Sequence, residues 1–164
     1  MKRTELGALE CNLASALSEI GDAWSLLIIK EIMLRNRRFD GIAAQTAISE
    51  SSLASRLKSL ERNGVVERRA YQNRPTRYEY RLTAKGADLW PTLVALTGWG
   101  DRWSGRETAP LVYQCNACGR DAHPHLTCEG CGADLDPRSV SPLQSDAMQA
   151  DRDARSERSA RASK

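Results

Sequence analysis

The stretch from Ser49 to Thr83 constrains the fold most, because a helix is followed there at once by a hairpin. Ser49 is a favourable N-cap and Gly64 suits the left-handed residue that ends a helix, so we expect a helix over residues 49–63. Its apolar residues form one narrow stripe at i, i+4 and i+7, namely Leu53, Leu57 and Leu60. The segments VVERRAY and RYEYRLT, separated by QNRPT, then predict two antiparallel strands and a turn.

Three helices are expected before this unit and one after it. Residues 11–20 repeat apolar side chains at helical spacing, AWSLLIIKEIML after the N-cap Asp22 is apolar on nearly all sides, and DGIAAQTA is a short third helix. After the hairpin, AKGADLWPTLVALTGWGDRW predicts a long helix that Pro91 either kinks or enters near a first turn. The apolar side of that helix packs either on its own domain or on a second copy of the chain: Leu89, Leu93, Leu96 and Trp103.

The net charge of +3 conceals a strongly basic stretch. Residues 35–81 hold eleven Arg and Lys against five Asp and Glu, whereas residues 109–137 hold one base and four acids. Clustered cations indicate a polyanionic partner, and a solvated charged face is the alternative.

Opposite its leucine stripe, the expected helix over 49–63 carries small hydroxyls and cations: Ser51, Ser55, Lys58, Ser59 and Arg62, with Ser52 and Arg56 at the flank. Such side chains permit close approach to a phosphate backbone and to base edges. Arg74 and Arg77 flank Pro75 at the hairpin tip, where an arginine has nothing to pack against. A narrow DNA minor groove attracts arginine by its negative potential.

Three helices, a fourth helix capped after a short turn, and then a two-stranded hairpin are the element order of a winged helix-turn-helix. The chain resembles the HxlR-type winged helix-turn-helix transcription regulators, which are distantly similar to MarR proteins. The resemblance spans residues 9–103 and is carried by LECNLASALSEIGDAWSLLIIKEIML, RRFDGI, ISESSLASRLKSLERNGVVERRAY and RPTRYEYRLTAKG. It implies a homodimer that binds double-stranded DNA sequence-specifically, with a recognition helix over 49–63 in the major groove and a wing over 65–82 at the minor groove. It identifies no effector ligand.

The DNA-binding residues expected on these grounds are Arg37, Arg38, Ser49, Ser51, Ser52, Ser55, Arg56, Lys58, Arg74 and Arg77. Many family members carry a lysine where this chain has Ser51, so the preferred DNA sequence does not carry over. Cys11 matches a position that is a redox-sensing thiol in some members, and a small buried hydrophobic residue is the alternative.

Beyond the family segment, four cysteines form two CxxC pairs, each followed by glycine: Cys115, Cys118, Cys128 and Cys131. This spacing is typical of a structural zinc ribbon, so the expected cofactor is one Zn²⁺ per chain held by four thiolates. Two local disulfides are the alternative, which a reducing cytosol disfavours. His123 and His125 lie between the pairs and either replace a cysteine, bind a second ion or face solvent. A closed four-thiolate site is not a catalytic one.

The sequence therefore predicts an α+β, mainly α, protein in three parts. A winged helix-turn-helix domain over 1–108 ends in a long dimerisation helix, a zinc-ribbon module covers 109–137, and a tail over 138–164 is too polar to order. No membrane span and no secretion signal are recognised, which indicates a cytoplasmic, nucleoid-associated protein. No nucleophile–base set or phosphate-binding glycine loop supports an enzyme. A basal transcription or adaptor factor that uses the same modules to contact proteins is the alternative function.

Overall fold

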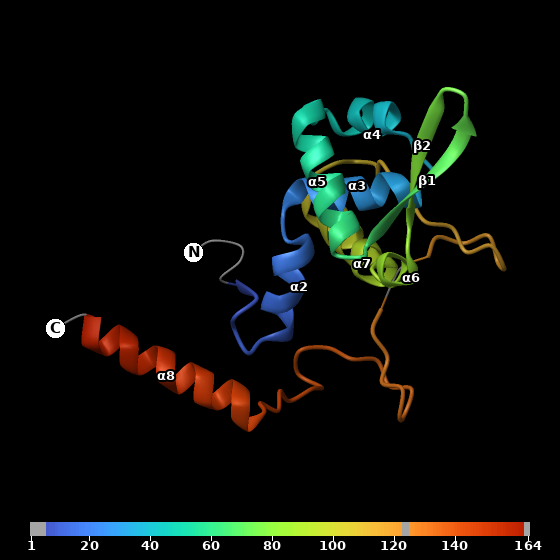
Figure 1. Ribbon diagram of the computed structural model, residues 1–164. Coiled ribbons are helices and arrows are strands. Elements are labelled where there is room, and N and C mark those ends of the chain that lie inside the picture. The colour runs from blue at the N-terminus through green and yellow to red at the C-terminus, as the bar shows by residue number, and fades with distance from the viewer. Residues whose placement is uncertain (1–5, 123–124, 163–164) are drawn as a thin grey trace. The chain divides into compact units, whose positions relative to one another are not determined.

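A computed structural model describes residues 6–122 and 125–162 of the chain. The chain divides into two compact units, one formed by residues 1–83 together with 142–164 and the other by residues 84–141. Unit 1 contains most of the helices and the two-stranded sheet (Figure 1).

The elements of unit 1 that are described before the sheet are the helices α2 (Asn12–Ile20), α3 (Ala23–Met33), α4 (Phe39–Thr46) and α5 (Glu50–Arg62) (Figure 1). Both predicted N-caps are confirmed. The Asp22 carboxylate accepts a hydrogen bond from the Ser25 N–H at 2.9 Å, and the Ser49 hydroxyl accepts one from the Ser52 N–H at 3.3 Å. Gly64 follows α5 with φ of +67°, a conformation that glycine adopts without steric cost.

The core of unit 1 forms where α3 meets α4, α5 and the base of the sheet. The predicted leucine stripe of α5 is fully buried, and so are Ile28 and Ile29 of the apolar helix α3. Val65 and Val66 continue this buried surface into the first strand. The recognition helix predicted from the sequence is therefore held by one face only, and its opposite face is left to solvent.

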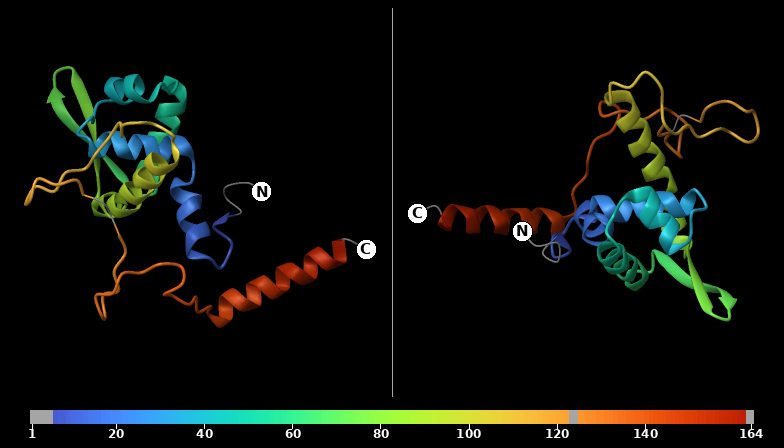
Figure 2. Two further views of the ribbon diagram at one scale, coloured as in Figure 1. Left: turned by 180° about the vertical axis from the view of Figure 1, so that it is seen from behind. Right: turned by 90° about the horizontal axis from the view of Figure 1, so that it is seen from above.

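The sheet is an antiparallel hairpin of β1 (Val66–Asn73) and β2 (Thr76–Leu82). Val66 pairs with Leu82 at its base and Asn73 with Thr76 at its tip, and the views from behind and above show the tip projecting past the helices α3, α4 and α5 of the same unit (Figure 2). Burial in β2 increases from the tip to the base: Thr76, Arg77 and Tyr78 are exposed, and residues 79–82 are half-buried. The reason is that only the base of the hairpin rests on the core.

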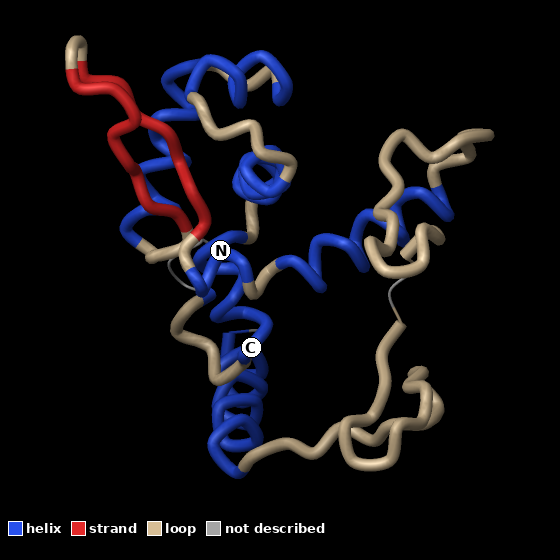
Figure 3. The backbone as a smooth tube through the Cα atoms, turned by 90° about the vertical axis from the view of Figure 1, so that its right-hand side faces the viewer, coloured by secondary structure: helices blue, strands red, loops and turns tan. Residues whose placement is uncertain are grey.

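Unit 2 begins with α6 (Ala84–Ala87) and α7 (Trp90–Trp103). The single helix expected over 84–103 is thus interrupted, and Pro91 lies in the first turn of α7, where its missing N–H costs no helical hydrogen bond. From residue 104 to the end of the unit, the described chain forms loops with two isolated β-bridges (Figure 3).

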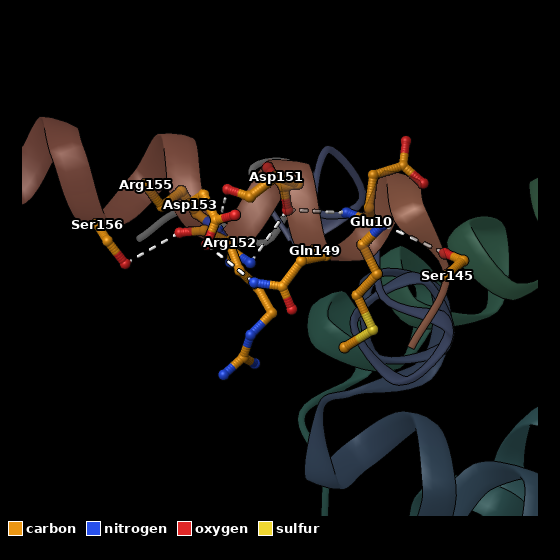
Figure 4. A network of polar contacts seen from close by, with 9 residues as sticks. Glu10, Ser145, Gln149, Asp151, Arg152, Asp153, Arg155 and Ser156 are labelled. Atoms are coloured by element: carbon orange, nitrogen blue, oxygen red, sulfur yellow. Dashed lines mark hydrogen bonds and ion pairs between the residues drawn. The ribbon is translucent and has the colours of Figure 1, made fainter. Parts of the chain in front are cut away.

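The disorder expected over residues 138–164 is wrong for residues 146–162, which form α8 (Asp146–Ala162). No residue of this helix is buried, so its order comes from hydrogen bonds and ion pairs within the helix and from one hydrogen bond donated by the N-terminal segment. Ser145 Oγ accepts from the Met148 N–H, an ion pair joins Asp151 to Arg155 at 3.0 Å, and the Glu10 N–H donates to Asp151 (Figure 4). Good helix formers and i,i+4 ion pairs outweighed the low hydrophobicity on which the expectation rested.

The architecture is mainly helical with a two-stranded wing, as the sequence predicts. Within the described ranges, no helix combines the length and the apolar character needed to cross a bilayer.

Candidate nucleic-acid interface

The outer face of α5 contains residues that cap the helix and residues whose side chains are exposed to solvent. Ser49 Oγ donates to Ser52 Oγ at 2.9 Å, and Ser52 is half-buried, so both hydroxyls are engaged at the start of the helix. Ser51, Ser55 and Lys58 are exposed. These exposed positions offer two small hydroxyls and one ammonium group to a ligand, and the hydroxyl of Ser51 also lies 3.3 Å from Ser49 Oγ in the capping cluster.

Arg56 points back toward the core. Its Nε lies 3.3 Å from Oδ1 of Asp22, the residue that caps α3. Nε is also shielded from solvent, although the side chain as a whole is 37% exposed. Arg56 is thus a predicted DNA-contact residue of α5 that also forms an ion pair with the N-cap of α3.

Both predicted arginines of the wing lie at its tip. Arg74 occupies the turn between the paired residues Asn73 and Thr76, and Arg77 pairs with Gln72 across the sheet. Gln72 Nε2 donates to the carbonyl oxygen of Arg74 at 3.0 Å, which fixes the turn. The side chains of both arginines are exposed.

The turn between α3 and α4 carries the basic pair Arg37 and Arg38 and contacts the wing twice. The Tyr80 N–H donates to the carbonyl oxygen of Arg37 at 2.8 Å, and the Arg38 guanidinium lies 4.7 Å from the centre of the Tyr71 ring. Tyr71 is the extra residue at an irregularity between the pairs of Ala70 and Gln72. A bulge of this kind changes the direction of a side chain, so it sets the position of this ring.

Sequence reasoning missed Tyr71 because the bulge depends on cross-strand pairing and has no local signature. It also missed Arg68, whose guanidinium lies 3.7 Å from the centre of the Tyr78 ring. The hydrogen bond with Tyr78 raises the pKa of Arg68, and the contact with the Tyr78 ring holds the guanidinium against the opposite strand of the wing.

The cations of the basic stretch fall into two groups. Carboxylates pair with Arg56, Arg69 and Arg81. Among the described residues, no ion pair involves the other cations predicted to bind DNA: Arg37, Arg38, Lys58, Arg74 and Arg77. The positive charge left unbalanced thus lies at the α3–α4 turn, on α5 and at the wing tip.

Cys11 is the N-cap residue of α2 and makes no side-chain capping hydrogen bond. Its thiol is partly exposed and unpaired. The structure thus places it at the start of the helix rather than within the apolar side on which the sequence expectation put it.

Each CxxC pair forms a compact knuckle. In the first, the Cys115 N–H donates to the carbonyl oxygen of Arg120 at 2.8 Å, and Gly119 has φ of +71°. The backbone N–H groups of Cys118 and Ala117 lower the pKa of the Cys115 thiol. Backbone amides directed at a thiolate are the environment that a bound metal ion also requires.

The second knuckle repeats this geometry. The Cys128 N–H donates to the carbonyl oxygen of Ala133 at 2.8 Å, Gly132 has φ of +72°, and the N–H groups of Cys131 and Gly130 lower the pKa of the Cys128 thiol.

The two knuckles do not come together. In the part of the chain that is described, no three Cys, His, Asp or Glu side chains are grouped closely enough to hold a metal ion. His125 lies on the surface with Nε2 3.5 Å from Oδ1 of Asp134, and His123 lies outside the described residues. The four cysteines are therefore two pairs of free thiols in this structure.

Comparison with known proteins identifies the family. The model of the HxlR-like helix-turn-helix family matches residues 19–108. An uncharacterised HTH-type transcriptional regulator of Mycobacterium bovis is 38% identical over 132 residues, which are 80% of this chain and 84% of that protein.

Two solved structures are similar as well. That of PA1607, a candidate transcription factor, has a TM-score of 0.77 and 26% identity, and the match covers 86% of this chain and 99% of that one. The redox regulator HypR in its oxidised form has a TM-score of 0.53 and 28% identity over 60% of this chain and all of that one. The winged fold, the basic surface and these relatives lead to one conclusion: the chain belongs to the HxlR-like helix-turn-helix family and is a DNA-binding transcriptional regulator rather than an enzyme.

Proposed function

We propose that the protein binds operator DNA as a homodimer, with α5 in the major groove and the wing at the minor groove of each half-site. The observation that carries this proposal is the separation of the cations. Arg56, Arg69 and Arg81 are paired with carboxylates, of which only Arg56 joins two elements of the fold, while Arg38, Lys58, Arg74 and Arg77 have no carboxylate partner among the described residues. Unbalanced cations release the counterions of DNA when they bind phosphates, which drives association.

Within this proposal the contact residues divide by task. Ser51 and Ser55 face base edges from α5, since small hydroxyls accept or donate a hydrogen bond without holding the helix away from the groove. Lys58, Arg37 and Arg38 bind phosphates, and Arg74 and Arg77 enter or follow the minor groove. Ser49 and Ser52 mainly fix the start of the helix, and Arg56 contacts DNA through the side of its guanidinium that faces away from Asp22.

The dimer uses the exposed apolar face of α7. Leu96, Trp99 and Trp103 fall at i, i+3 and i+7 and are 48%, 64% and 71% exposed. Three large apolar side chains on one helix face are costly to leave in water, and a second copy covers them.

The cysteine knuckles hold one structural zinc ion. Each knuckle already has the turn that a metal-binding CxxC pair needs, and zinc brings the two pairs into one tetrahedral set. Structural zinc sites are worth about 10–16 kcal/mol in small peptides, enough to close a segment that buries almost no apolar surface. The acidic module does not touch phosphates. Its task in this proposal is to brace the dimer or to contact another protein.

Cys11 is the candidate redox thiol, since it is partly exposed and since one structural relative is named a redox regulator. The alternative of a basal transcription or adaptor factor gains no support from the relatives, which are named as transcriptional regulators.

Fluorescence anisotropy tests the proposal with a duplex taken from upstream of the protein's own gene and a scrambled duplex of equal length, at two salt concentrations. Preference for the first duplex that persists at the higher salt supports an operator. Equal binding that salt abolishes at both duplexes contradicts it.

A further inference from the structure

The chain folds back along α7 after leaving it. Gly105, with φ of +68°, follows the end of the helix, and the returning segment brings Tyr113 to Trp90 with their ring centres 6.1 Å apart and their planes at 73°. The helix face that runs through Val94, Thr97 and Asp101 is thereby covered by residues of the same unit. This face differs from the one that carries Trp99 and Trp103.

The covering is incomplete and leaves a cavity of about 240 Å³. Helix α7 supplies one wall, the returning segment Ala109–Tyr113 a second wall, and the stem of the first cysteine knuckle the rest. The apolar residues around it are Val94, Ala109, Leu111, Val112, Tyr113 and Ala122. A Cβ atom built on Gly98, which also lines the cavity, meets no atom within 4 Å, so the space above this residue is open.

The charged groups at this cavity are all negative. Asp101 comes from α7 and Asp121 from the knuckle stem, and the lining residues include no Arg, Lys or His. Within the described residues, neither carboxylate has a hydrogen bond or ion pair from its side chain. Two unpaired carboxylates beside an apolar wall complement a ligand that has a positive charge and an apolar body.

We propose that this cavity binds a small organic ammonium ion, with one aromatic ring or a comparable apolar group against Tyr113 and the ammonium group at Asp101 and Asp121. The volume is below the range of about 300–1,000 Å³ found for sites that bind drug-sized molecules, so the ligand has a single ring. A bare divalent cation fits poorly, because calcium takes six to eight oxygen ligands and the walls here are mostly apolar. This binding site does not rest on the proposed contacts with DNA.

Benzylamine is the probe, and benzyl alcohol and benzoate are its neutral and anionic counterparts. Saturation-transfer NMR and calorimetry with the full-length protein should detect the binding of benzylamine. Benzyl alcohol and benzoate should bind roughly tenfold more weakly or not at all. The double variant Asp101→Asn with Asp121→Asn should lose this preference for the amine.

Gly98→Leu fills the cavity and should abolish benzylamine binding, while Gly98→Ala, which makes a similar gain in helix propensity, should retain it. Circular dichroism and thermal melting verify that each variant is folded. Equal binding of the amine and the alcohol, or amine binding that survives both Gly98→Leu and the double Asn variant, would overturn the proposal. Absence of benzylamine binding to the wild-type protein would overturn it as well.

Discussion

The Arg56 guanidinium lies against the carboxylate of Asp22, with Nε 3.3 Å from Oδ1. This contact joins the proposed recognition helix α5 to the N-cap of α3, and the sequence places α4 between these two helices. One charged residue of the outer face of α5 is therefore partly used within the fold.

Asp22 both caps α3 and pairs with Arg56, and the variant Asp22→Asn separates these two roles. Asparagine caps a helix as well as aspartate does but cannot form the ion pair. We expect the free energy of unfolding to fall by about 1–2 kcal/mol, because the partly exposed ion pair contributes little but the hydroxyl of the buried Ser25 also loses the carboxylate oxygen to which it donates at 2.6 Å. DNA affinity should not fall, because Arg56 is released toward the DNA. Chemical denaturation and anisotropy measure the two effects, with Asp22→Ala as the variant that loses the cap as well. A large loss of DNA affinity in Asp22→Asn would show that the ion pair positions α5.

The wing prediction concerns Arg74 and Arg77. Replacing both by alanine should weaken DNA binding and lower the slope of log affinity against log salt by about two, one for each lost phosphate contact. Arg69→Ala is the matched control, because this arginine of the same hairpin is paired with Glu67 at 2.6 Å. Affinities measured at four or more salt concentrations decide the question. A slope that the double variant leaves unchanged would remove the wing from the interface.

The pH dependence of stability should reflect Glu31. Burial raises the pKa of the Glu31 carboxyl, but the hydrogen bond from Asn36 Nδ2 at 3.0 Å and the nearby Lys30 ammonium lower it further, so the net pKa is below the ordinary value. A carboxyl with a depressed pKa in the folded state stabilises the fold above its unfolded pKa. That contribution disappears as the pH falls through the folded-state pKa.

Glu31→Gln should therefore cost on the order of 1 kcal/mol at neutral pH and lose its cost in acid. Denaturant titrations from pH 7 to pH 3 measure this difference between variant and wild type. A cost that is the same at all these pH values would mean that the charge of Glu31 is irrelevant.

The dimer prediction concerns the exposed face of α7. Trp99→Glu with Trp103→Glu should convert the protein to a monomer, because each carboxylate would have to be buried without a partner. Arg102→Glu introduces an acid into the same turn outside the apolar face and should leave the dimer intact. Light scattering after gel filtration gives the mass of each variant. A wild-type monomer, or a dimer that survives both tryptophan replacements, would exclude this interface.

The zinc prediction concerns the two knuckles. Elemental analysis should find one zinc per wild-type chain and none in Cys115→Ser with Cys128→Ser, while Cys11→Ser should retain the full amount. Chelation should release the metal and separate the knuckles without melting the winged helix, whose core contains none of the four cysteines. Metal-free protein whose mass corresponds to two disulfides would favour the alternative.

The features that local chemistry decides were predictable. Ser49 and Gly64 bound α5 as the sequence indicates, and Pro91 lies in the first turn of α7, because caps and proline act on their own helix. The helix propensity of residues 146–162 predicts α8, whereas their low hydrophobicity predicts disorder, and the propensity decides the structure.

Long-range features had no such signal. The contact of Arg56 with Asp22 depends on how α5 packs on α3, and the direction of Tyr71 depends on an irregularity in strand pairing. The segment over residues 109–113 likewise covers one face of α7 because the chain folds back along this helix. No spacing of residues in the sequence predicts that packing. The cavity with Asp101 and Asp121 follows from that return.

The most direct test of the central claim is methylation interference on the duplex that the protein binds. If α5 reads the major groove of two half-sites, methylation of guanine N7 should block binding at two clusters related by two-fold symmetry, about one helical turn or a multiple apart. Methylation of adenine N3 in the minor groove beside each cluster should block binding too, and should cease to do so with Arg74→Ala and Arg77→Ala. Interference at a single unsymmetrical site, or none in the major groove, would contradict this account of how the protein binds DNA.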